Sequence, residues 1–488
     1  MRRLQLDPKI SASIVFVCAL FMSIMDGTIV NVALPSLGRQ LHVPNTSIDA
    51  VVVAYLVSLA IVIPVSGWLG DRWGTKRIFL FALALFSAAS ALCGLAASFA
   101  MLVGFRVLQG LAGGALTPVG TAILYRTFPP DQRVQVSRIL IVPTIIAPAT
   151  GPILGGLLVD QLSWRWVFFV NVPIGIAACL FGLLFLYEHR EPTAGRFDIA
   201  GFLLAGSGLG LVMYALSEGS TYEWTSSRIL GSAIVGLLLL GAFVFVEQRI
   251  PEPMIDLRLL NDSLFRTTNL ASLFASAGFL GLLFVAPLYL QEGRGFSALT
   301  SGLTTFPEAI GVVLFTQIVA RLYPGIGPRR LMVGGLVWVA IMMLLLYLMG
   351  NDTSLWLMRA LMFFTGAGMA FVFLPVQAAA FATISSASTG RASALYNAQR
   401  QLGAALGVAV LGSVLSAVGP TYVGANNTVL PNLAAYHAAF LAASILALIA
   451  ACFALAVSDC DAAVTMQRHE RTRYKKAPNQ ASSAEAGS

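Results

Sequence analysis

The sequence has few charged residues. Only 11% of its 488 residues are Asp, Glu, Lys or Arg, whereas 57% are hydrophobic. Soluble globular domains carry about 25% charged residues, so this composition argues against a chain that folds entirely in water. Long apolar stretches recur from Ile14 to Val457 with short polar gaps between them. Because about 20 apolar residues span a bilayer as a helix, whereas barrel strands alternate over about 10, we predict an all-α integral membrane protein.

Histidine and cysteine are too scattered to build a catalytic or metal centre. The four histidines lie in loops and at the ends of the apolar stretches. The five cysteines have neither metal-site nor disulfide-framework spacing. No Walker A sequence, nucleophile elbow or metal motif occurs. We therefore predict a protein that is not an enzyme, uses no cofactor or metal and hydrolyses no ATP.

The apolar stretches predict fourteen transmembrane helices. Their approximate limits are 12–34, 49–69, 78–97, 99–124, 136–158, 165–187, 198–217, 228–246, 267–290, 299–320, 331–349, 355–382, 393–417 and 436–457. The first stretch follows Arg2, Arg3 and Lys9, as a signal peptide would, but it contains Asp26 and continues to Leu34 without a small-residue cleavage site. We expect it to be retained as the first span.

Basic residues alternate in number from loop to loop. Of the 30 Lys and Arg residues, 24 fall on the N-terminal side, 4 on the other side and 2, Arg106 and Arg359, within spans. Arg391 and Arg400, around the start of the thirteenth span, are counted on the N-terminal side. Because cytoplasmic loops carry the excess of positive charge, we expect a multi-pass cell (inner) membrane protein with both termini in the cytoplasm. The net charge of +8 thus indicates contact with the lipid bilayer and not with nucleic acid.

The two halves of the chain resemble each other. When the sequence is shifted by 253 or 252 residues, a basic loop, an arginine near the start of a span and two glycines within a span in the first half match the same features in the second half. The matched positions are Gly74 to Arg77 with Gly327 to Arg330, Arg106 with Arg359, Gly151 with Gly403, and Gly155 with Gly407. Duplicated six-helix halves around a central site fit alternating access.

We therefore predict two pseudo-symmetric six-helix bundles around a central cavity, with two intervening helices. The N-terminal bundle covers residues 1–190, and the two intervening transmembrane helices with a cytoplasmic loop cover 191–262. The C-terminal bundle covers 263–457. The polar, Ser/Ala-rich remainder, 458–488, is predicted to be a disordered cytoplasmic tail.

Charged residues inside apolar stretches are informative, because each costs several kcal/mol unless it meets a partner or water. Asp26 lies near the middle of the first span, and Glu308 lies near the middle of the tenth, directly after Pro307. A carboxylate in a low-dielectric cavity can take up protons near neutral pH, and a nearby arginine or bound cation can expel them. We expect Asp26, Arg106 and Glu308 to couple protons to substrate; the alternative is that either acid is permanently paired and structural.

A Gly/Asp/Arg/Gly pattern follows the second span, in the stretch Gly67-Trp-Leu-Gly-Asp71-Arg72-Trp-Gly74-Thr-Lys76-Arg77. Its glycines allow a tight turn and close approach of helices. Its acid can pair with a neighbouring arginine or lie near a helix N-terminus, and so latch the cytoplasmic side. The alternative is a plain solvated basic loop. The predicted cytoplasmic gate comprises Gly67, Asp71, Arg72, Gly74, Lys76 and Arg77.

A second glycine motif lies inside the fifth span. Gly151, Gly155 and Gly156 have the small-residue spacing that lets helices touch closely, and Pro152 provides a bend. We therefore predict a hinge at a helix interface.

Four stretches together resemble the major facilitator superfamily, in its fourteen-span drug:proton antiporter branch, over nearly the whole chain to about Val457. They are Met25 to Pro35, Gly67 to Arg77, Leu102 to Gly110 and Gly151 to Gly156. The resemblance implies that Asp26 is the span-one acid used in coupling or substrate recognition and that Arg106 is the span-four arginine associated with proton transfer. It also implies a cytoplasmic gate at Asp71 and Arg72.

In the resemblance, Gly151, Pro152 and Gly155 shape the antiporter hinge. The chain departs from the family pattern at Pro143 and Pro148, where a further glycine is frequent. It also departs in the second-half loop, which lacks an acid matching Asp71. Arg359 is the expected second-half counterpart of Arg106.

The sequence as a whole predicts a proton-coupled antiporter that exports small hydrophobic or cationic compounds by alternating access, as in multidrug efflux and antibiotic resistance. Cationic substrates are favoured if both Asp26 and Glu308 face the cavity. A proton-coupled importer and a lipid or metabolite transporter of the same fold are the alternatives, and a membrane-embedded enzyme lacks a constellation of catalytic residues. A periplasmic adaptor protein and a dimer are left open as partners.

Overall fold

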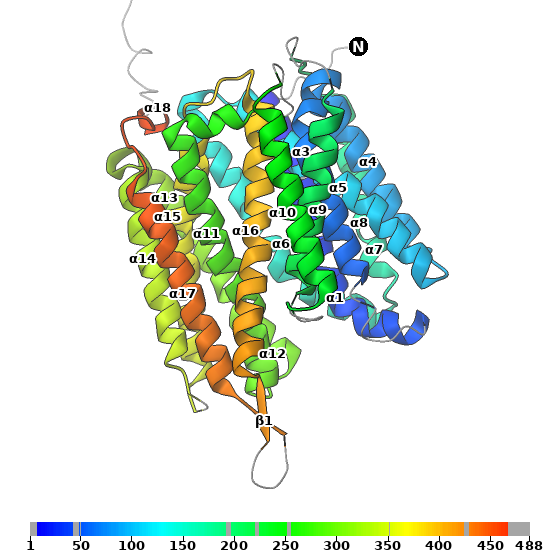
Figure 1. Cartoon of the computed structure of the whole chain (residues 1–488), viewed down its shortest axis with the longest axis vertical. Helices are drawn as coiled ribbons and strands as arrows, with labels where there is room; N and C mark the ends of the chain where they lie inside the picture. Colours follow the sequence, from blue (N-terminus) through cyan, green and yellow to red (C-terminus); the bar gives the residue numbers. More distant parts are fainter. Residues whose placement is uncertain are drawn as a thin grey trace, which may run out of the picture.

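The computed structural model describes residues 7–41, 48, 50–191, 197–219, 224–250, 255–350, 352–423 and 429–466. The described chain is almost entirely helical (Figure 1), as the sequence predicts. The helices of the first half are α1 (Pro8–Leu41), α3 (Ala50–Trp73), α4 (Thr75–Gly94), α5 (Phe99–Thr127), α6 (Arg133–Gln161), α7 (Trp166–Phe169) and α8 (Asn171–Phe185). A short η1 helix (Pro130–Gln132) precedes α6.

The second half begins after two intervening helices, α9 (Ile199–Glu218) and α10 (Ser227–Glu247). It contains η2 (Leu257–Asn261), α11 (Ser263–Leu288), the single π turn η3 (Tyr289–Gly293), α12 (Ala298–Thr305), α13 (Pro307–Ile326), α14 (Pro328–Tyr347), α15 (Leu355–Ala380), α16 (Thr389–Val418), α17 (Leu433–Leu455) and α18 (Ala463–Met466). One small hairpin joins α16 to α17, in which β1 (Thr421–Val423) pairs antiparallel with β2 (Val429–Pro431).

Thirteen helices within the described ranges are long and apolar enough to cross a membrane. They match thirteen of the predicted spans. The helix at the place of the remaining one, predicted at 136–158, is α6, which has 29 residues but is not among the thirteen. Several α6 side chains, including that of Pro152, lie outside the described residues.

Two of the predicted spans are broken in the structure. The predicted span 165–187 divides into α7 and α8. The predicted span 299–320 divides at Phe306 into α12 and α13, and Pro307 occupies the first position of α13. Proline has no N–H and its ring clashes with the preceding turn, so it is tolerated at a helix start but interrupts a continuous helix. Pro307 therefore lies where the helix is interrupted.

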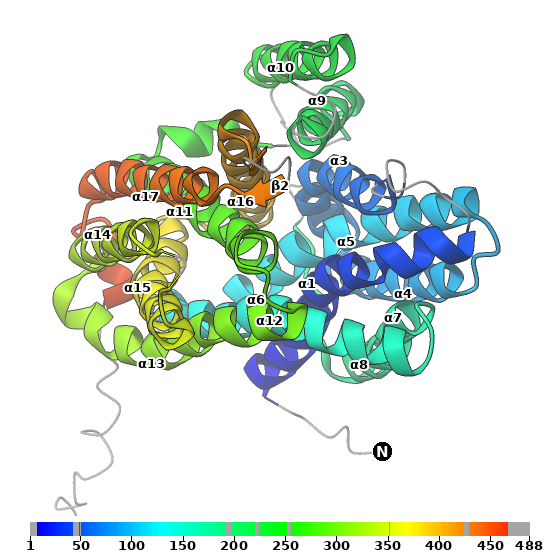
Figure 2. The ribbon, with the colours of Figure 1, turned by 90° about the horizontal axis from the view of Figure 1, so that it is seen from below.

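The same packing partners recur in the two halves of the chain. In the first half α1 packs on α6 and α8, α3 on α5, and α4 on α5 and α8. In the second half α11 packs on α16 and α17, α13 on α15, and α14 on α15 and α17. Figure 2 shows α9 and α10 at one edge of the molecule, where α9 packs on both α3 and α16. The intervening helices thus cover the line where the two halves meet.

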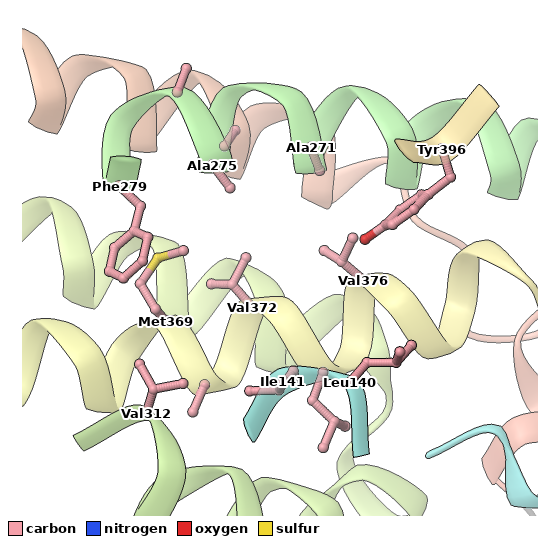
Figure 3. Packing of buried hydrophobic residues seen from close by; sticks show 14 of the residues in the cluster. Leu140, Ile141, Ala271, Ala275, Phe279, Val312, Met369, Val372, Val376 and Tyr396 are labelled. Atoms are coloured by element: carbon pink, nitrogen blue, oxygen red, sulfur yellow. The ribbon is translucent and has the colours of Figure 1, made fainter. Parts of the chain in front are cut away.

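Apolar side chains from both halves form one continuous core. Figure 3 shows Leu140 and Ile141 of α6 on one side of α15, and Ala271 and Ala275 of α11 on the other, around Val372. All five are buried. The first half therefore contributes directly to the packing of α15.

The beginning of the predicted tail is ordered. Asp459 accepts a hydrogen bond from the backbone N–H of Arg329 at 2.9 Å, and the hydroxyls of Thr465 and Tyr323 lie 2.8 Å apart. Residues 458–466 therefore attach to the α13–α14 turn, and the prediction of disorder from residue 458 is wrong for them. A carboxylate at a helix N-terminus and a buried hydroxyl pair are local contacts that composition does not reveal. The rest of the tail, 467–488, lies outside the described residues.

Candidate functional site

Asp26 and Arg106 form a buried ion pair in the first half of the chain. Arg106 Nη1 donates to Asp26 Oδ2 at 2.6 Å, and both side chains are fully buried. Asp26 Oδ1 accepts two further hydrogen bonds, from Gln109 Nε2 at 2.9 Å and from Asn171 Nδ2 at 2.8 Å. The side chains that meet at the carboxylate come from α1, α5 and α8. A fourth helix, α3, contacts the arginine, because the backbone oxygen of Val51 accepts from Arg106 Nε. The structure thus pairs Asp26 with Arg106, a partner that the sequence did not specify.

The guanidinium of Arg106 is held between aromatic rings. Its Cζ lies 4.3 Å from the centre of the Tyr55 ring and 5.8 Å from that of Phe168. A guanidinium over an aromatic face gains about 1–2 kcal/mol when it is shielded from water. Its Nη2 atom nevertheless has no hydrogen-bond partner among the described residues. The pair is therefore well packed but keeps one unused donor.

A cavity of about 180 Å³ is lined in part by Tyr55. Its wall comes from α1, α3 and α5 of the first half and from α16 of the second. The lining residues are Ser23, Ile24, Gly27, Tyr55, Leu56, Leu59, Ile63, Gly113, Gly114, Thr117, Pro118, Asn397, Arg400 and Gln401. Asp26 does not line the cavity, although its neighbour Gly27 does. Arg106 does not line it either, but it contacts the ring of Tyr55, which does.

The charged residue in the cavity wall is Arg400. We expected it on the N-terminal side with the loop arginines, and that assignment is wrong: Arg400 lies inside α16, whose span runs from Thr389 to Val418. The predicted span 393–417 already contains Arg400, so the error was to count this residue with the loop arginines. The positive-inside count considers only the number of loop charges and gives no rotation of a helix about its axis.

Glu308 is buried but does not join the Asp26 group. It lies in the first turn of α13, is 5% exposed and does not line the cavity. Its Oε1 atom has no hydrogen-bond partner among the described residues. The structure therefore places the two predicted carboxylates apart, and in this conformation neither faces the cavity.

Arg359 does not reproduce the environment of Arg106. Its Cζ lies 4.6 Å from the ring centre of its neighbour Trp356, and its Nε is buried without a partner among the described residues. The second-half helix α11, which packs on α15 as α1 packs on α5, contains no acidic residue. A counterpart of the Asp26–Arg106 pair is therefore absent from α11 and α15.

Asp71 forms the second buried ion pair, at the end of the molecule where α1 begins. Its Oδ1 accepts from Arg126 Nη2 at 2.7 Å, and both side chains are at most 6% exposed. Arg126 Nε also donates to the backbone oxygen of Ser386, at 3.3 Å, in the segment that leads into α16. The pair thus joins α3 and α5 of the first half to the second half. The predicted pairing with an arginine is present, but the partner is Arg126 and not the exposed Arg72.

Close contacts between the halves continue around this pair. A side chain at Gly67 would meet the backbone oxygen of Gly390 at 2.5 Å, so glycine is required for α3 to lie this close to α16. Tyr125 stacks on Phe381 with ring centres 4.2 Å apart, and its hydroxyl donates to the backbone oxygen of Gln377. This end of the interface is therefore closed in the structure.

The rest of the gate loop binds the end of α8. Gly74 has φ +105°, and Glu188 fills the space beside it and accepts a hydrogen bond from the Lys76 backbone N–H at 3.0 Å. Lys76 Nζ donates to the terminal carbonyls of Leu183 and Leu186, and Arg77 pairs with Glu188 at 3.5 Å. These residues hold α4 to α8 within the first half.

The second half repeats this arrangement with an acid from a different part of the chain. Gly327, matched to Gly74, has φ +86°, and Asp459 fills the space beside it and accepts from the Arg329 backbone N–H. Asp459 thus corresponds to Glu188 and not to Asp71. The second-half loop still has no counterpart of Asp71, as the sequence indicates.

The span-five glycines bring α6 against α1 beside Asp26. A side chain at Gly151 would meet Thr28 Oγ1 at 2.1 Å, and one at Gly155 would meet the Ile29 backbone oxygen at 3.1 Å. Gly156 has open space on its outer side. In the second half, Gly403 and Gly407 approach the backbone oxygens of Leu273 and Ala277 on α11 in the same way. The small-residue interface is therefore present, whereas the Pro152 side chain lies outside the described ones.

Sequence reasoning missed four side chains of these sites. Gln109 stands one turn after Arg106 in the span-four stretch, and this spacing places both on one helix face. Arg126 lies in the last turn of the same helix, on a different face, and its position gives no signal of its pairing with Asp71. Asn171 and Arg400 give only a weak signal, a polar residue within an apolar stretch, because their neighbours come from distant parts of the chain.

Comparisons with known proteins agree with this architecture. The family model of the Major Facilitator Superfamily matches residues 16–408 and 270–484. The putative multidrug resistance protein MdtD of Serratia proteamaculans is 31% identical over 449 residues, which cover 92% of this chain and 93% of that protein. The MdtD protein of Yersinia enterocolitica is 32% identical over 421 residues, covering 86% and 88%.

Two solved structures share the fold. The human organic anion transporter MFSD10 superposes with a TM-score of 0.65 at 17% identity, over 92% of this chain and all of that chain. The proton:xylose symporter XylE superposes with a TM-score of 0.63 at 14% identity, over 91% and 95%. At such identities the likeness shows the fold alone.

Proposed function

The chain belongs to the major facilitator superfamily, and from this premise we propose that it is a proton-coupled antiporter that exports small hydrophobic compounds by alternating access. The observation that carries the proposal is the buried Asp26–Arg106 pair, whose arginine contacts Tyr55, a residue in the wall of a cavity between the halves. The curated relatives are named as putative multidrug resistance proteins, which favours export and a broad substrate range.

The coupling step follows from the hydrogen bonds of Asp26. Its two oxygens accept three hydrogen bonds from Arg106, Gln109 and Asn171. A proton on Asp26 would remove the attraction between the carboxylate and Arg106, so protonation favours movement of Arg106 away from Asp26. Movement of Arg106 would also change its contacts with Tyr55 and the Val51 carbonyl, both on α3. Protonation would thus shift α1 and α5 relative to α3, which lines the cavity.

Alternating access requires the closed end of the interface to open. The Asp71–Arg126 pair with the Ser386 carbonyl is the proposed cytoplasmic latch, together with the Gly67–Gly390 contact. The hinge is proposed at Gly151, Pro152, Gly155 and Gly156, where α6 crosses α1 next to Asp26.

The finer architecture is also proposed. With α6 counted as a span, fourteen helices form two six-helix units, 1–190 and 263–457, joined by the helices of 191–262. We place the protein in the cell (inner) membrane with both termini cytoplasmic, because basic residues are concentrated on that side.

The test is proton movement in proteoliposomes. Purified protein is reconstituted with a pH gradient, and luminal pH is recorded while lipophilic cations, neutral antibiotics and organic anions are added. Asp26→Asn and Glu308→Gln are compared with Asp262→Asn, which changes a carboxylate that only caps α11 and that asparagine replaces well. We expect at least one compound to dissipate the gradient through wild type and Asp262→Asn but not through Asp26→Asn.

If no compound moves protons although the protein is folded and inserted, the exporter proposal loses its basis. A lipid or metabolite transporter of the same fold then becomes the better explanation. If a compound moves together with protons and not against them, the protein is an importer.

A further inference from the structure

Resting on the proposed export function, we infer that the central cavity binds hydrophobic compounds that carry a carboxylate or a similar anionic group, and that Arg400 is the residue that recognises this group. The sequence favours cations only if Asp26 and Glu308 face the cavity. The structure instead places an arginine in the cavity wall and both acids outside it.

Arg400 has no partner for its charge among the described residues. It forms no ion pair and no hydrogen bond with them, and Tyr396, one turn earlier on α16, is a neutral side chain. No Asp or Glu lines the cavity. The other nearby charges, Asp26 and Arg106, neutralise each other and do not line the cavity. The cavity therefore has an uncompensated positive charge.

An unpaired guanidinium within a membrane span is unfavourable unless water or an anion satisfies it. Arginine presents a planar fork of donors that matches a carboxylate in two parallel hydrogen bonds. Gln401, next to Arg400 in the cavity wall, also has no hydrogen-bond partner among the described side chains and adds a further donor. A carboxylate would thus meet three or more donors on the α16 side.

The opposite wall fits an apolar body. Leu56, Leu59 and Ile63 of α3 and Ile24 of α1 line it, together with the ring of Tyr55. The cavity volume of about 180 Å³ exceeds the approximately 150 Å³ that holds benzene in an engineered protein cavity. The cavity therefore has room for one aromatic ring, with the acid directed toward Arg400.

The inference is tested by binding of three matched probes: 4-phenylbutyrate, its neutral amide and 4-phenylbutylamine. Affinities are measured by isothermal titration calorimetry with the full-length protein in nanodiscs. For wild type we expect the carboxylate to bind about tenfold or more tightly than the amide, because hydrogen bonds to charged groups contribute about 1.5–3 kcal/mol, and the amine to bind most weakly. Arg400→Gln should remove the preference for the carboxylate and leave the amide affinity within about twofold.

Two further variants separate recognition from loss of structure. Arg400→Lys keeps the charge without the fork and should retain a reduced preference for the carboxylate. Arg359→Gln removes another span arginine outside the cavity and should leave all three affinities unchanged. A wild-type protein that binds the amine as tightly as the carboxylate would overturn the inference, as would an unchanged preference in folded Arg400→Gln or Arg400→Lys.

The binding result and the transport result can fail separately. If the amide or the amine drives proton movement but the carboxylate neither binds nor moves protons, the anion site is refuted and export by proton antiport stands. If the carboxylate binds through Arg400 but no compound moves protons, the site stands and the proposed transport function does not.

Discussion

Asp26 is a fully buried carboxylate that accepts three side-chain hydrogen bonds. Three donors from two other helices converge on one carboxylate, and a fourth helix contacts the arginine that neutralises it. Removing one member of a buried ion pair leaves the other charge without compensation, which is more costly than removing both. The pair is therefore both the centre of the coupling proposal and a structural contact.

A double-mutant cycle measures this dependence. Asp26→Asn and Arg106→Gln should each lower the free energy of unfolding by about 3–5 kcal/mol, and the double variant should lose less than the sum. Unfolding in detergent at increasing denaturant concentrations gives the four values. Additive losses would show that the two side chains do not interact in the folded protein.

His189 provides a pH dependence outside the spans. Partial burial lowers its pKa below the ordinary value of 6.5, and the charge of Arg126 acts in the same direction, whereas Glu191, Asp71 and Glu188 oppose it. As the pH falls, the unfolded chain therefore protonates His189 at a higher pH than the folded protein does. The contribution of the neutral His189 to the free energy of unfolding is complete above about pH 6.5 and is lost as the pH falls below that value.

Replacement of His189 should remove that contribution. Between pH 8 and pH 5 we expect the melting temperature of His189→Gln in detergent to fall less than that of wild type. Equal slopes for wild type and His189→Gln would contradict the assignment.

At the scale of the helix, glycine decides how close α1 and α6 come. Alanine is favoured over glycine in a helix by roughly 0.5–1 kcal/mol, so any loss on substitution reports on contacts with neighbouring helices. Gly151 faces Thr28 and Ile29, whereas Gly156 on the same helix faces open space. The two positions therefore form a natural comparison.

Gly151→Ala should destabilise the protein by about 1–3 kcal/mol and slow transport, because its methyl group would enter the space of Thr28. Gly156→Ala should be neutral or slightly stabilising. Melting temperature and the initial rate of gradient dissipation check both. If Gly151→Ala changed neither the melting temperature nor the rate, α6 could move away from α1 without loss of stability, contrary to a tight hinge.

On the scale of the whole molecule, the described conformation is closed where the Asp71–Arg126 pair meets the second half. Arg126 contacts both halves, through the Asp71 carboxylate and the Ser386 carbonyl. Ser393 is fully buried at this interface and donates to the Pro118 carbonyl at 2.7 Å. Its accessibility therefore reports whether the halves have separated.

Arg126→Gln should open this end. With the five native cysteines replaced and Ser393→Cys introduced, we expect maleimide labelling to become at least several-fold faster in Arg126→Gln. Arg72→Gln, which removes an exposed arginine of the same motif, should label at the original rate. Equal slow labelling in all three proteins would mean that the pair does not hold the halves together.

The charge of the exported compound determines how the transporter responds to membrane potential. When one proton enters and one singly charged anion leaves, two elementary positive charges move inward in total. The membrane potential then contributes about 4.6 kcal/mol per 100 mV to the free energy of exchange. Export of 4-phenylbutyrate should therefore accelerate when a potassium diffusion potential makes the vesicle side corresponding to the cytoplasm negative. Transport of the amide should respond about half as strongly, and equal responses would exclude movement of the charged form.

Much of the fold could be predicted from the sequence because the bilayer acts on each residue locally. A charged side chain costs energy wherever it enters the apolar layer, so hydropathy locates the spans, and Asp26 and Arg106 are conspicuous within them. The glycines at 67, 151 and 155 were identifiable because close helix contact requires small residues at helical spacing. Residues 16–408 and 270–484 match the superfamily that the motifs resemble.

The tertiary structure alone decided which of these residues meet. Asp71 pairs with Arg126 instead of its neighbour Arg72, Arg400 lies in the wall of a cavity, and Glu308 lies away from that cavity. Helix rotation and crossing determine these contacts, and they depend on side-chain packing summed over many residues from distant parts of the chain. A sequence pattern therefore determines that a helix crosses the membrane, and the packing of its neighbours determines which of its faces lines the cavity.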